Sequence, residues 1–292
     1  MKNNIPKYVH LGKDVFIGHD CIFSKMKSDT KQGRISFGDY CSVHDNCSFY
    51  MTDEEFTLGD YGIIHNNTLV KGYKKCTIGH NSWIGQNSII NSTNTLTIGN
   101  NFGIGAYSQI WTHAFFGELL LGCRIGVGIP DFESKPGSIT IGDDFWGIGK
   151  ITISPGVKIG NKVIALTNSL ITKDVKDNTI VGGIPAKPIP IDGNFKAYAD
   201  LNEKEKFQLM KRFSTQFAKL KNVRVTIDPK TKKIVLGNNE IMINCSHNHT
   251  NIKNDRVTYF DVIRRTYTKK HNKLEREFME FIIGYKARFI PE

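Results

Sequence analysis

The residue of this sequence best placed to do chemistry is a histidine beside a long irregular stretch. His113 follows Thr112 and comes directly before residues 114–138, which are rich in Gly, Phe and Pro. An imidazole titrates near neutral pH, so it can take the proton of a hydroxyl group while that hydroxyl attacks an electrophile. Loops of this length inside a compact fold are often functional. The alternative is a solvated or hydrogen-bonded surface histidine, and the residue types alone leave both interpretations open.

A six-residue repeat surrounds His113 and must position it. Aliphatic or aromatic residues recur every six positions, and a small or branched residue mostly follows each of them four positions later. The recurring apolar residues are Leu11 and Ile17; Phe37, Val43 and Phe49; Leu58, Ile64 and Val70; Ile78, Ile84 and Ile90; Ile98, Ile104 and Ile110; and then Ile141, Ile153, Ile159 and Ile171. In a coil of three short strands, such residues point inward on every face while the small residues fit the corners. The hexads therefore predict a parallel β-helix whose coils rest only on their neighbours.

The spacing of the coils supports this architecture. Coils begin at 37, 58, 78 and 98, separations of 21, 20 and 20 residues, which are three hexads plus a short insert at one corner. The register is lost only within 114–138, which we expect to protrude as a loop. Cys41 and Cys47 fall at corner positions, where free cysteines pack well. Turn residues spaced by chance in an ordinary all-β domain are the alternative, but successive sets in one register disfavour it.

The run from Ile141-Gly-Asp-Asp-Phe-Trp146 to Gly160, with Ser169-Leu-Ile-Thr-Lys-Asp174 and the ending Val181-Gly-Gly-Ile-Pro-Ala-Lys187, resembles a known family. It is similar to the hexapeptide-repeat acyltransferases, left-handed parallel β-helix proteins that include galactoside, maltose, serine and polysaccharide O-acetyltransferases. The resemblance covers about residues 10 to 190. It implies a mainly β fold, with a left-handed β-helix domain over 1–190. The hexads stop after that, and the apolar patterns of residues 191–292 predict a separate, smaller α+β domain.

The resemblance also implies a site. The family's catalytic base is a histidine at the edge of an outward loop, which His113 matches, and its acyl donor, acetyl-CoA, lies in a groove between adjacent helices of a homotrimer. The residues that match the family's CoA contacts are Trp146, beside the pantetheine arm; Gly149 and Thr167, whose main chain meets that arm; and Thr172, Lys173 and Lys187, near the adenosine phosphates.

The sequence departs from the family pattern at three points near these residues. It has Gly147 where an aliphatic residue is usual, Ala165-Leu-Thr-Asn-Ser169 where the family has a Gly-rich turn, and Ala114 where sugar acetyltransferases have proline. No carboxylate partner for His113 is evident, and Glu118, Asp131 and Glu133 of the loop are the candidates.

Histidines and cysteines do not predict a metal site. His19, His44, His65 and His80 lie in the repeats without the spacing that zinc enzymes of this fold use, and His247-Asn-His249 lacks a distant further ligand. The six cysteines form no Cys-x-x-Cys pair, so we expect free thiols in a reducing compartment. We also expect a cytoplasmic protein, because the sequence has neither a long apolar run nor the apolar core of a secretory signal.

The last third of the chain carries the charge. The whole sequence has 39 Lys and Arg against 28 Asp and Glu, a formal net charge of +11, of which residues 196–292 contribute 21 basic and 11 acidic residues, or +10. Apolar periodicity predicts a helix after Asn202 with Phe207, Met210, Phe213, Phe217 and Leu220 on one face, then a hairpin over 223–236 and a strand over 240–244. Two further helices are predicted near 258–267 and 272–286.

The resemblance implies an O-acetyltransferase that uses acetyl-CoA, and we expect it to modify a sugar of a bacterial surface glycan without a metal. The basic region suits an anionic acceptor, such as a sialylated oligosaccharide, or peripheral contact with the inner membrane face. The alternative is that its lysines are simply solvated on helix surfaces and bind no partner. Nucleic acid is disfavoured because no recognised binding motif accompanies the charge. The alternatives are N-acetylation of an amino-sugar nucleotide and, in another class, a non-catalytic β-helix scaffold whose basic domain binds glycans.

Overall fold

The structure is a computed structural model that describes residues 5–25, 33–51, 54–115, 118–122, 126–127, 137–247, 254 and 256–292. The chain divides into two compact units, Met1–Tyr198 and Ala199–Glu292. Residues 191–198, which the sequence assigns to the C-terminal domain, belong to the first unit. The backbone N–H of Ile180 donates to the Phe195 carbonyl at 3.1 Å, and that of Tyr198 donates to the Asn178 side chain at 2.7 Å.

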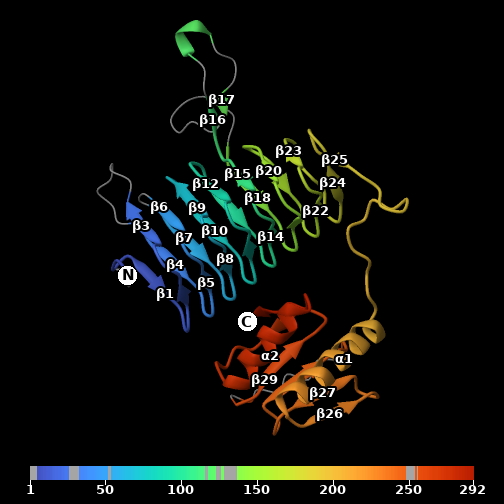
Figure 1. Cartoon of the computed structure of the whole chain (residues 1–292). Helices are drawn as coiled ribbons and strands as arrows, with labels where there is room; N and C mark the ends of the chain where they lie inside the picture. Colours follow the sequence, from blue (N-terminus) through green and yellow to red (C-terminus); the bar gives the residue numbers. More distant parts are fainter. Residues whose placement is uncertain are drawn as a thin grey trace. The chain divides into compact units, whose positions relative to one another are not determined.

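The first unit is the predicted parallel β-helix, in which each coil contributes one short strand to each of three sheets (Figure 1). Sheet A contains, in spatial order, β1 (Val9–Leu11), β4 (Ile35–Phe37), β7 (Phe56–Leu58), β10 (Cys76–Ile78), β13 (Leu96–Ile98), β18 (Ile139–Ile141) and β21 (Lys158–Ile159). Sheet B contains β2 (Phe16–Ile17), β5 (Ser42–Val43), β8 (Ile63–Ile64), β11 (Trp83–Ile84), β14 (Gly103–Ile104), β19 (Trp146–Gly147), β22 (Ile164–Ala165), β24 (Ile180–Gly182) and β25 (Lys187–Pro188). Sheet C contains β3 (Ile22–Lys25), β6 (Ser48–Met51), β9 (Leu69–Gly72), β12 (Ile89–Ser92), β15 (Gln109–Ile110), β20 (Thr152–Ile153) and β23 (Leu170–Ile171).

The hexad residues build the core, as predicted. Ile64, Ile84, Ile104 and Ile153, one on each of successive coils, are almost completely buried, as are most other repeat aliphatics, although Leu11 of the first coil is 42% exposed. Each buried methylene removes apolar surface from water and so stabilises the stack. Cys41 and Cys47 are buried at corners, and among the described cysteines Cys21, Cys41, Cys47, Cys76 and Cys245 are free thiols. The predicted left-handed parallel β-helix is therefore confirmed.

Asparagines and aspartates allow the chain to turn at the coil corners. Asn81, Asn101 and Asp144 all have φ between 56 and 61°, a left-handed conformation that their short polar side chains tolerate well. They also form a ladder between coils, since Asn81 Nδ2 donates to Asn101 Oδ1 at 3.1 Å and Asn101 Nδ2 donates to Asp144 Oδ1 at 3.0 Å. The side chains thus satisfy the turn and tie adjacent coils together.

The predicted loop leaves the stack directly after His113. Strand β16 (Ala114–Phe115) pairs in antiparallel fashion with β17 (Gly126–Val127), with the short helix η1 (Leu119–Leu121) between them, and these elements project from the coils (Figure 1). The remaining loop residues, 116–117, 123–125 and 128–136, lie outside the described residues. Sheet A resumes at β18, so the loop interrupts a coil without breaking the stacking register.

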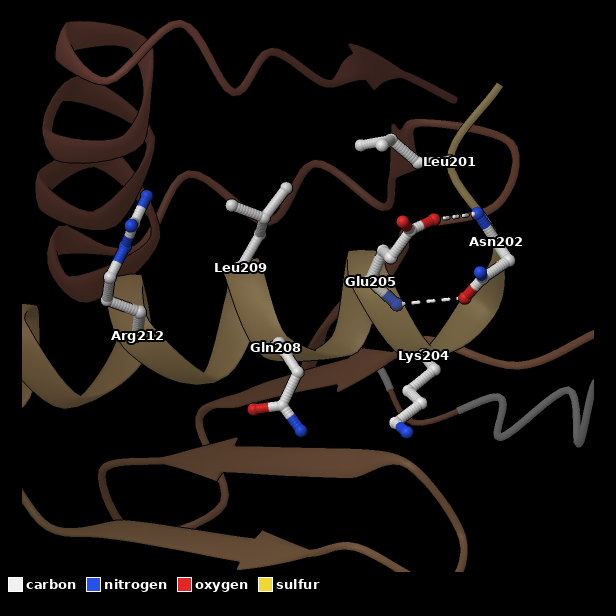
Figure 2. A pocket seen from close by; sticks show the side chains of 7 residues that line it. All are labelled: Leu201, Asn202, Lys204, Glu205, Gln208, Leu209 and Arg212. Carbon is white, nitrogen blue, oxygen red and sulfur yellow. Dashed lines mark hydrogen bonds between the residues drawn. The ribbon is translucent and has the colours of Figure 1, made fainter. Parts of the chain in front are cut away.

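The second unit is an α+β fold. Helix α1 (Glu203–Lys221) precedes a sheet with the order β26 (Val225–Asp228), β27 (Lys233–Leu236), β28 (Ile241–Asn244), β29 (Thr258–Asp261), β30 (Thr266–Tyr267) and β31 (Ile290–Pro291), and helix α2 (Lys273–Gly284) lies between β30 and β31 in sequence. At the start of α1 the Asn202 and Glu205 side chains each accept a hydrogen bond from the other's backbone N–H, a capping box (Figure 2).

Two expectations for this unit were wrong. The predicted helix over 258–267 is the hairpin β29–β30: Phe260 and Tyr267 are cross-strand partners whose stacked rings are 5.3 Å apart, so their spacing of seven, read as two helical turns, is a hairpin pairing. Leu220, predicted on the buried face of α1, is 67% exposed. None of the helices in the described ranges is long and apolar enough to cross a membrane.

Candidate active site

His113 lies at the corner that follows β15 in sheet C, beside a small pocket. The pocket has a volume of about 270 Å³ and is lined by Trp111, His113, Ala114, Thr152, Ser154 and Pro155. Trp111 packs edge-on to the imidazole with the ring centroids 6.2 Å apart, and its Nε1 donates to Gln109 at 2.9 Å. The pocket therefore combines an imidazole, an indole and the two hydroxyl-bearing residues of the next coil.

A buried asparagine on the preceding coil holds the imidazole. His113 Nδ1 lies 3.1 Å from Oδ1 of Asn91, a residue of β12 that is 5% exposed. The same oxygen accepts from the Thr112 hydroxyl at 2.8 Å and from the backbone N–H groups of Thr112 at 3.3 Å and Thr93 at 3.2 Å. Asn94 on the connection after β12 completes the network by donating to the Thr112 carbonyl at 2.9 Å.

This network decides which imidazole nitrogen carries the proton. A backbone N–H can only donate, so the Asn91 atom that receives two of them must be the carbonyl oxygen and not the amide nitrogen. A carbonyl oxygen can only accept, so His113 Nδ1 must be the protonated nitrogen. The neutral ring therefore keeps its lone pair on Nε2, the nitrogen that can accept a proton from another molecule.

The surroundings of His113 favour the neutral, proton-accepting form. Partial burial lowers the pKa of His113 from its ordinary value because a charged ring is poorly solvated there, and the nearby Lys71 ammonium lowers this pKa further by repulsion. Lys71 is exposed on β9, in register with Asn91 of β12, so it lies one coil below the asparagine that holds the ring. The imidazole is consequently ready to act as a base at neutral pH.

The residues matched to CoA contacts lie on two sides of the β-helix. Trp146 belongs to β19 in sheet B, and Gly149 and Thr167 lie at the corners that lead from sheet B to sheet C. Thr172 and Lys173 follow β23, at the same corner of the stack as His113, two coils further on. Lys187 begins β25, which pairs in antiparallel fashion with β24 at the end of the stack. Among the described residues that line the His113 pocket, none comes from this set.

Two glycines illustrate how differently these positions are packed. The Trp146 indole lies over Gly103 of the preceding coil so closely that a Cβ at Gly103 would come within 2.4 Å of the ring. At Gly149, by contrast, a Cβ would meet only the Ala106 carbonyl oxygen, at an ordinary 3.9 Å. Packing within the coil thus requires a glycine at 103 but not at 149, and the surface beside Gly149 stays open.

The sequence analysis did not predict that Asn91, Lys71 and Ser154 lie around His113. Asn91 aligns with Trp111 when the coils are superimposed by their hexads, and the signal available was a polar residue directly after the core position Ile90, one coil before His113. Among the described residues, the side chain that contacts His113 Nδ1 is thus the amide of Asn91. Of the carboxylate candidates, Glu118 is exposed and accepts from the Leu120 N–H, while Asp131 and Glu133 lie outside the described residues.

The described residues contain no group of three or more His, Cys, Asp and Glu side chains that could hold a metal ion. His247 is exposed, and its backbone N–H donates to Glu203 at 2.8 Å. His249 lies outside the described residues.

No protein-family model matches the chain. Among curated proteins it is similar to a chloramphenicol acetyltransferase of Klebsiella aerogenes, with 44% identity over 59 residues that cover 20% of this chain and 28% of that protein. It is also similar to the galactoside O-acetyltransferase of Escherichia coli K12, with 28% identity over 78 residues, or 27% and 34% of the two chains. The aligned part spans about a third or less of these relatives.

Among solved structures, the chain is similar to a maltose O-acetyltransferase from Clostridium difficile, at 21% identity and a TM-score of 0.35, covering 58% of this chain and 70% of that one. Another is an N-acyltransferase from Bacillus cereus, at 18% identity and a TM-score of 0.40, covering 71% and 91%. The curated relatives carry the stronger similarity, and they are acetyltransferases. The resemblance to hexapeptide-repeat acyltransferases that the sequence indicates is therefore confirmed.

Proposed function

We propose that this protein transfers an acetyl group from acetyl-CoA to a hydroxyl group of a sugar, with His113 as the general base. The observation that carries the proposal is the Asn91 network, which fixes Nδ1 of His113 as the protonated nitrogen and leaves Nε2 to accept a proton. A sugar hydroxyl is a poor nucleophile at neutral pH, so a base that removes its proton during attack accelerates the reaction.

In the proposed reaction both substrates bind before transfer. The acceptor oxygen forms a bond to the thioester carbonyl carbon while its proton passes to His113 Nε2, and a backbone N–H stabilises the oxyanion of the tetrahedral intermediate. The intermediate collapses by breaking the carbon–sulfur bond, and the imidazolium returns its proton to the departing CoA sulfur. The Thr152 and Ser154 hydroxyls line the same pocket and are suited to hydrogen-bond with a sugar.

Acetyl-CoA would lie along the outside of the last coils. The open surface beside Gly149 and the half-buried Trp146 indole suit the pantetheine arm, and the exposed Thr167, Thr172, Lys173 and Lys187 would contact the remainder of the donor. An exposed ammonium at the end of a rigid coil is a suitable phosphate partner. Trp146 lies in sheet B whereas His113 follows sheet C, which supports a groove between two copies in a homotrimer. Ile148, 58% exposed beside Gly149, would be covered there.

For the acceptor we propose an anionic sugar, such as a sialylated residue of a bacterial surface glycan. The Lys71 ammonium near His113 is suited to a carboxylate on the acceptor, and the +10 charge of residues 196–292 would attract an anionic chain. Such a reaction would take place in the cytoplasm, where the same basic region could rest against the inner membrane face.

The test is incubation of the purified protein with acetyl-CoA and a panel of anionic and neutral oligosaccharides, followed by mass spectrometry. We expect the mass of an acetyl group to be added to an anionic oligosaccharide, with one CoA released per transfer, and His113→Gln to abolish the addition. Transfer to free amino-sugar nucleotides that persists in His113→Gln would favour N-acetylation instead, because a neutral amine needs less help from a base. Tight glycan binding without any transfer would favour the scaffold alternative.

A further inference from the structure

The second unit contains a pocket that the proposed acetyl transfer does not use. It has a volume of about 350 Å³, within the range of about 300–1,000 Å³ that small-molecule sites occupy. It lies between the first half of α1 and the segment that follows α2, and the described residues of the unit Ala199–Glu292 form all of its lining. The lining residues are Leu201, Lys206, Leu209, Met210, Arg212, Phe213, Val262, Arg265, Tyr285, Lys286, Ala287, Arg288 and Phe289.

Cationic side chains dominate the polar part of this lining. Lys206, Arg212, Arg265, Lys286 and Arg288 all border the pocket, and none of its described lining residues is acidic. The first two come from α1, Arg265 from the turn between β29 and β30, and the last two from the segment after α2. Five cationic side chains from three separate elements surround this one cavity, and such a cluster creates a positive potential that attracts anions. Their convergence therefore points to an anionic ligand.

The apolar part of the pocket presents aromatic rings. Tyr285 is 51% exposed, and its ring lies 5.2 Å from that of Phe213 at an interplanar angle of 32°. The Arg212 guanidinium sits over the Phe213 ring, 5.1 Å from its centroid. Figure 2 shows that Leu209 and Arg212 point to the same side of α1, whereas Lys204 and Gln208 point to the other side. An exposed ring next to guanidinium groups suits a ligand with an apolar face and a carboxylate, since arginine binds carboxylates with two parallel hydrogen bonds.

Two of the cations occupy backbone positions where glycine would be more favourable. Arg265 has φ 57° and Lys286 has φ 62°, in the left-handed region that glycine adopts without strain. Lys286 lies just beyond α2, where glycine most often ends a helix. The Arg265 carbonyl accepts a hydrogen bond from the Ile290 N–H at 2.8 Å, so the pairing of β30 with β31 holds the backbone of this turn. A glycine at either position would keep the backbone and remove only the charged side chain.

We propose that this pocket binds a segment of an anionic oligosaccharide, with a sugar ring against Tyr285 and its carboxylate between Arg265, Lys286 and Arg288. The inference deepens the proposed function, on which it rests for the identity of the ligand as an acceptor chain. It assigns to the second unit a subsite separate from the His113 pocket. Such a subsite would hold a long acceptor while one of its sugars reacts.

The test is calorimetric titration of the full-length protein with an oligomer of sialic acid, a galacturonic acid oligomer and a neutral malto-oligosaccharide of equal length. We expect an acidic oligomer to bind and the neutral one not to bind. Arg265→Gly and Lys286→Gly should each weaken binding by roughly tenfold or more, because each removes a charge-assisted contact. Their melting temperatures should equal or exceed that of the wild type, since glycine relieves the left-handed strain.

Control variants distinguish binding in this pocket from nonspecific attraction by the basic surface of the unit. Lys219→Ala and Lys230→Ala remove exposed lysines of the same unit outside the pocket without placing a glycine inside α1, and they should leave affinity within about twofold. Single-stranded DNA of equal charge is the competitor. Affinity that is unchanged in Arg265→Gly and Lys286→Gly, or equal losses in the control variants, would overturn the inference. Equal binding of DNA and acidic oligomers would overturn it in favour of nonspecific polyanion attraction.

The same experiment keeps the two proposals apart. His113→Gln should bind the acidic oligomer as the wild type does. Binding without acetyl transfer would refute the proposed function but not the assignment of the pocket. If Arg265→Gly transferred acetyl groups as efficiently as the wild type to both long and short acceptors, the pocket would have no role in holding the acceptor.

Discussion

Asn91 offers the sharpest test of how the site is held, because its side chain touches His113 and no substrate step requires it. When His113 takes a proton, its Nδ1–H bond to Asn91 Oδ1 becomes a bond from a charged donor. A bond from a charged donor contributes about 1.5–3 kcal/mol and one from a neutral donor about 0.5–1.5 kcal/mol. Only the difference, about 1–1.5 kcal/mol, lowers the barrier, so Asn91→Ala should lower kcat by roughly 5- to 15-fold. The loss should be smaller than that of His113→Ala, in which the base itself is missing.

The same substitution should also destabilise the fold. Asn91 is buried, and its oxygen accepts from the backbone N–H groups of Thr93 and Thr112 and from the Thr112 hydroxyl. A buried donor left without a partner costs about 1–3 kcal/mol, so the melting temperature of Asn91→Ala should fall measurably. Activity must therefore be measured well below that temperature.

Asn91→Asp is the matched variant that keeps the geometry. A carboxylate oxygen accepts the same bonds, and its negative charge favours the imidazolium, so the pKa of His113 should rise. A raised pKa means that the neutral base forms only at higher pH, so the rising limb of the plot of kcat/KM against pH should shift to higher pH. The assay is CoA release over a range of pH values. Wild-type kcat in Asn91→Ala, or a rising limb at the wild-type pH in Asn91→Asp, would show that Asn91 neither holds His113 nor affects its protonation.

Three further predictions concern the surroundings of the site. Lys71→Met removes the positive charge that lowers the pKa of His113, so the rising limb of kcat/KM should move to higher pH, and an unmoved or lowered limb contradicts the assigned cause. Gly103→Ala places a Cβ within 2.4 Å of the Trp146 ring and so displaces the indole. Acetyl-CoA binding measured by calorimetry should weaken by roughly three- to tenfold, with little change in kcat. Unchanged affinity would mean that the indole does not contact acetyl-CoA. Lys187→Ala should weaken acetyl-CoA binding by roughly three- to tenfold at low ionic strength and much less at high salt, and a loss that ignores salt would exclude a phosphate contact.

The β-helix was predictable because its sequence repeats. A residue that recurs every six positions has the same surroundings in every coil. Ile64, Ile84 and Ile104 therefore occupy equivalent buried positions in three successive coils. The loop after His113 was visible for the same reason, as the place where the repeat fails. The imidazole partner was not, because Asn91 lies 22 residues before His113 and meets it only through the coil spacing.

The second unit was less predictable because it does not repeat. The spacing of Phe260 and Tyr267 fits two helical turns and a hairpin pairing equally well, and the parallel pairing of β29 with β28 decides between them. The cationic pocket likewise joins residues from α1, the β29–β30 turn and the segment after α2. Sequence charge counts locate the basic region, but only tertiary packing gathers five of its cations around one cavity.

Chemical rescue of His113→Ala is the direct test of whether His113 removes the acceptor proton. Acetyl transfer by this variant should be roughly 100- to 10,000-fold slower than in the wild type, with an unchanged dissociation constant for acetyl-CoA, and added imidazole should restore part of the rate. Near wild-type transfer without imidazole, or a loss explained entirely by weaker acetyl-CoA binding, would contradict this role of His113.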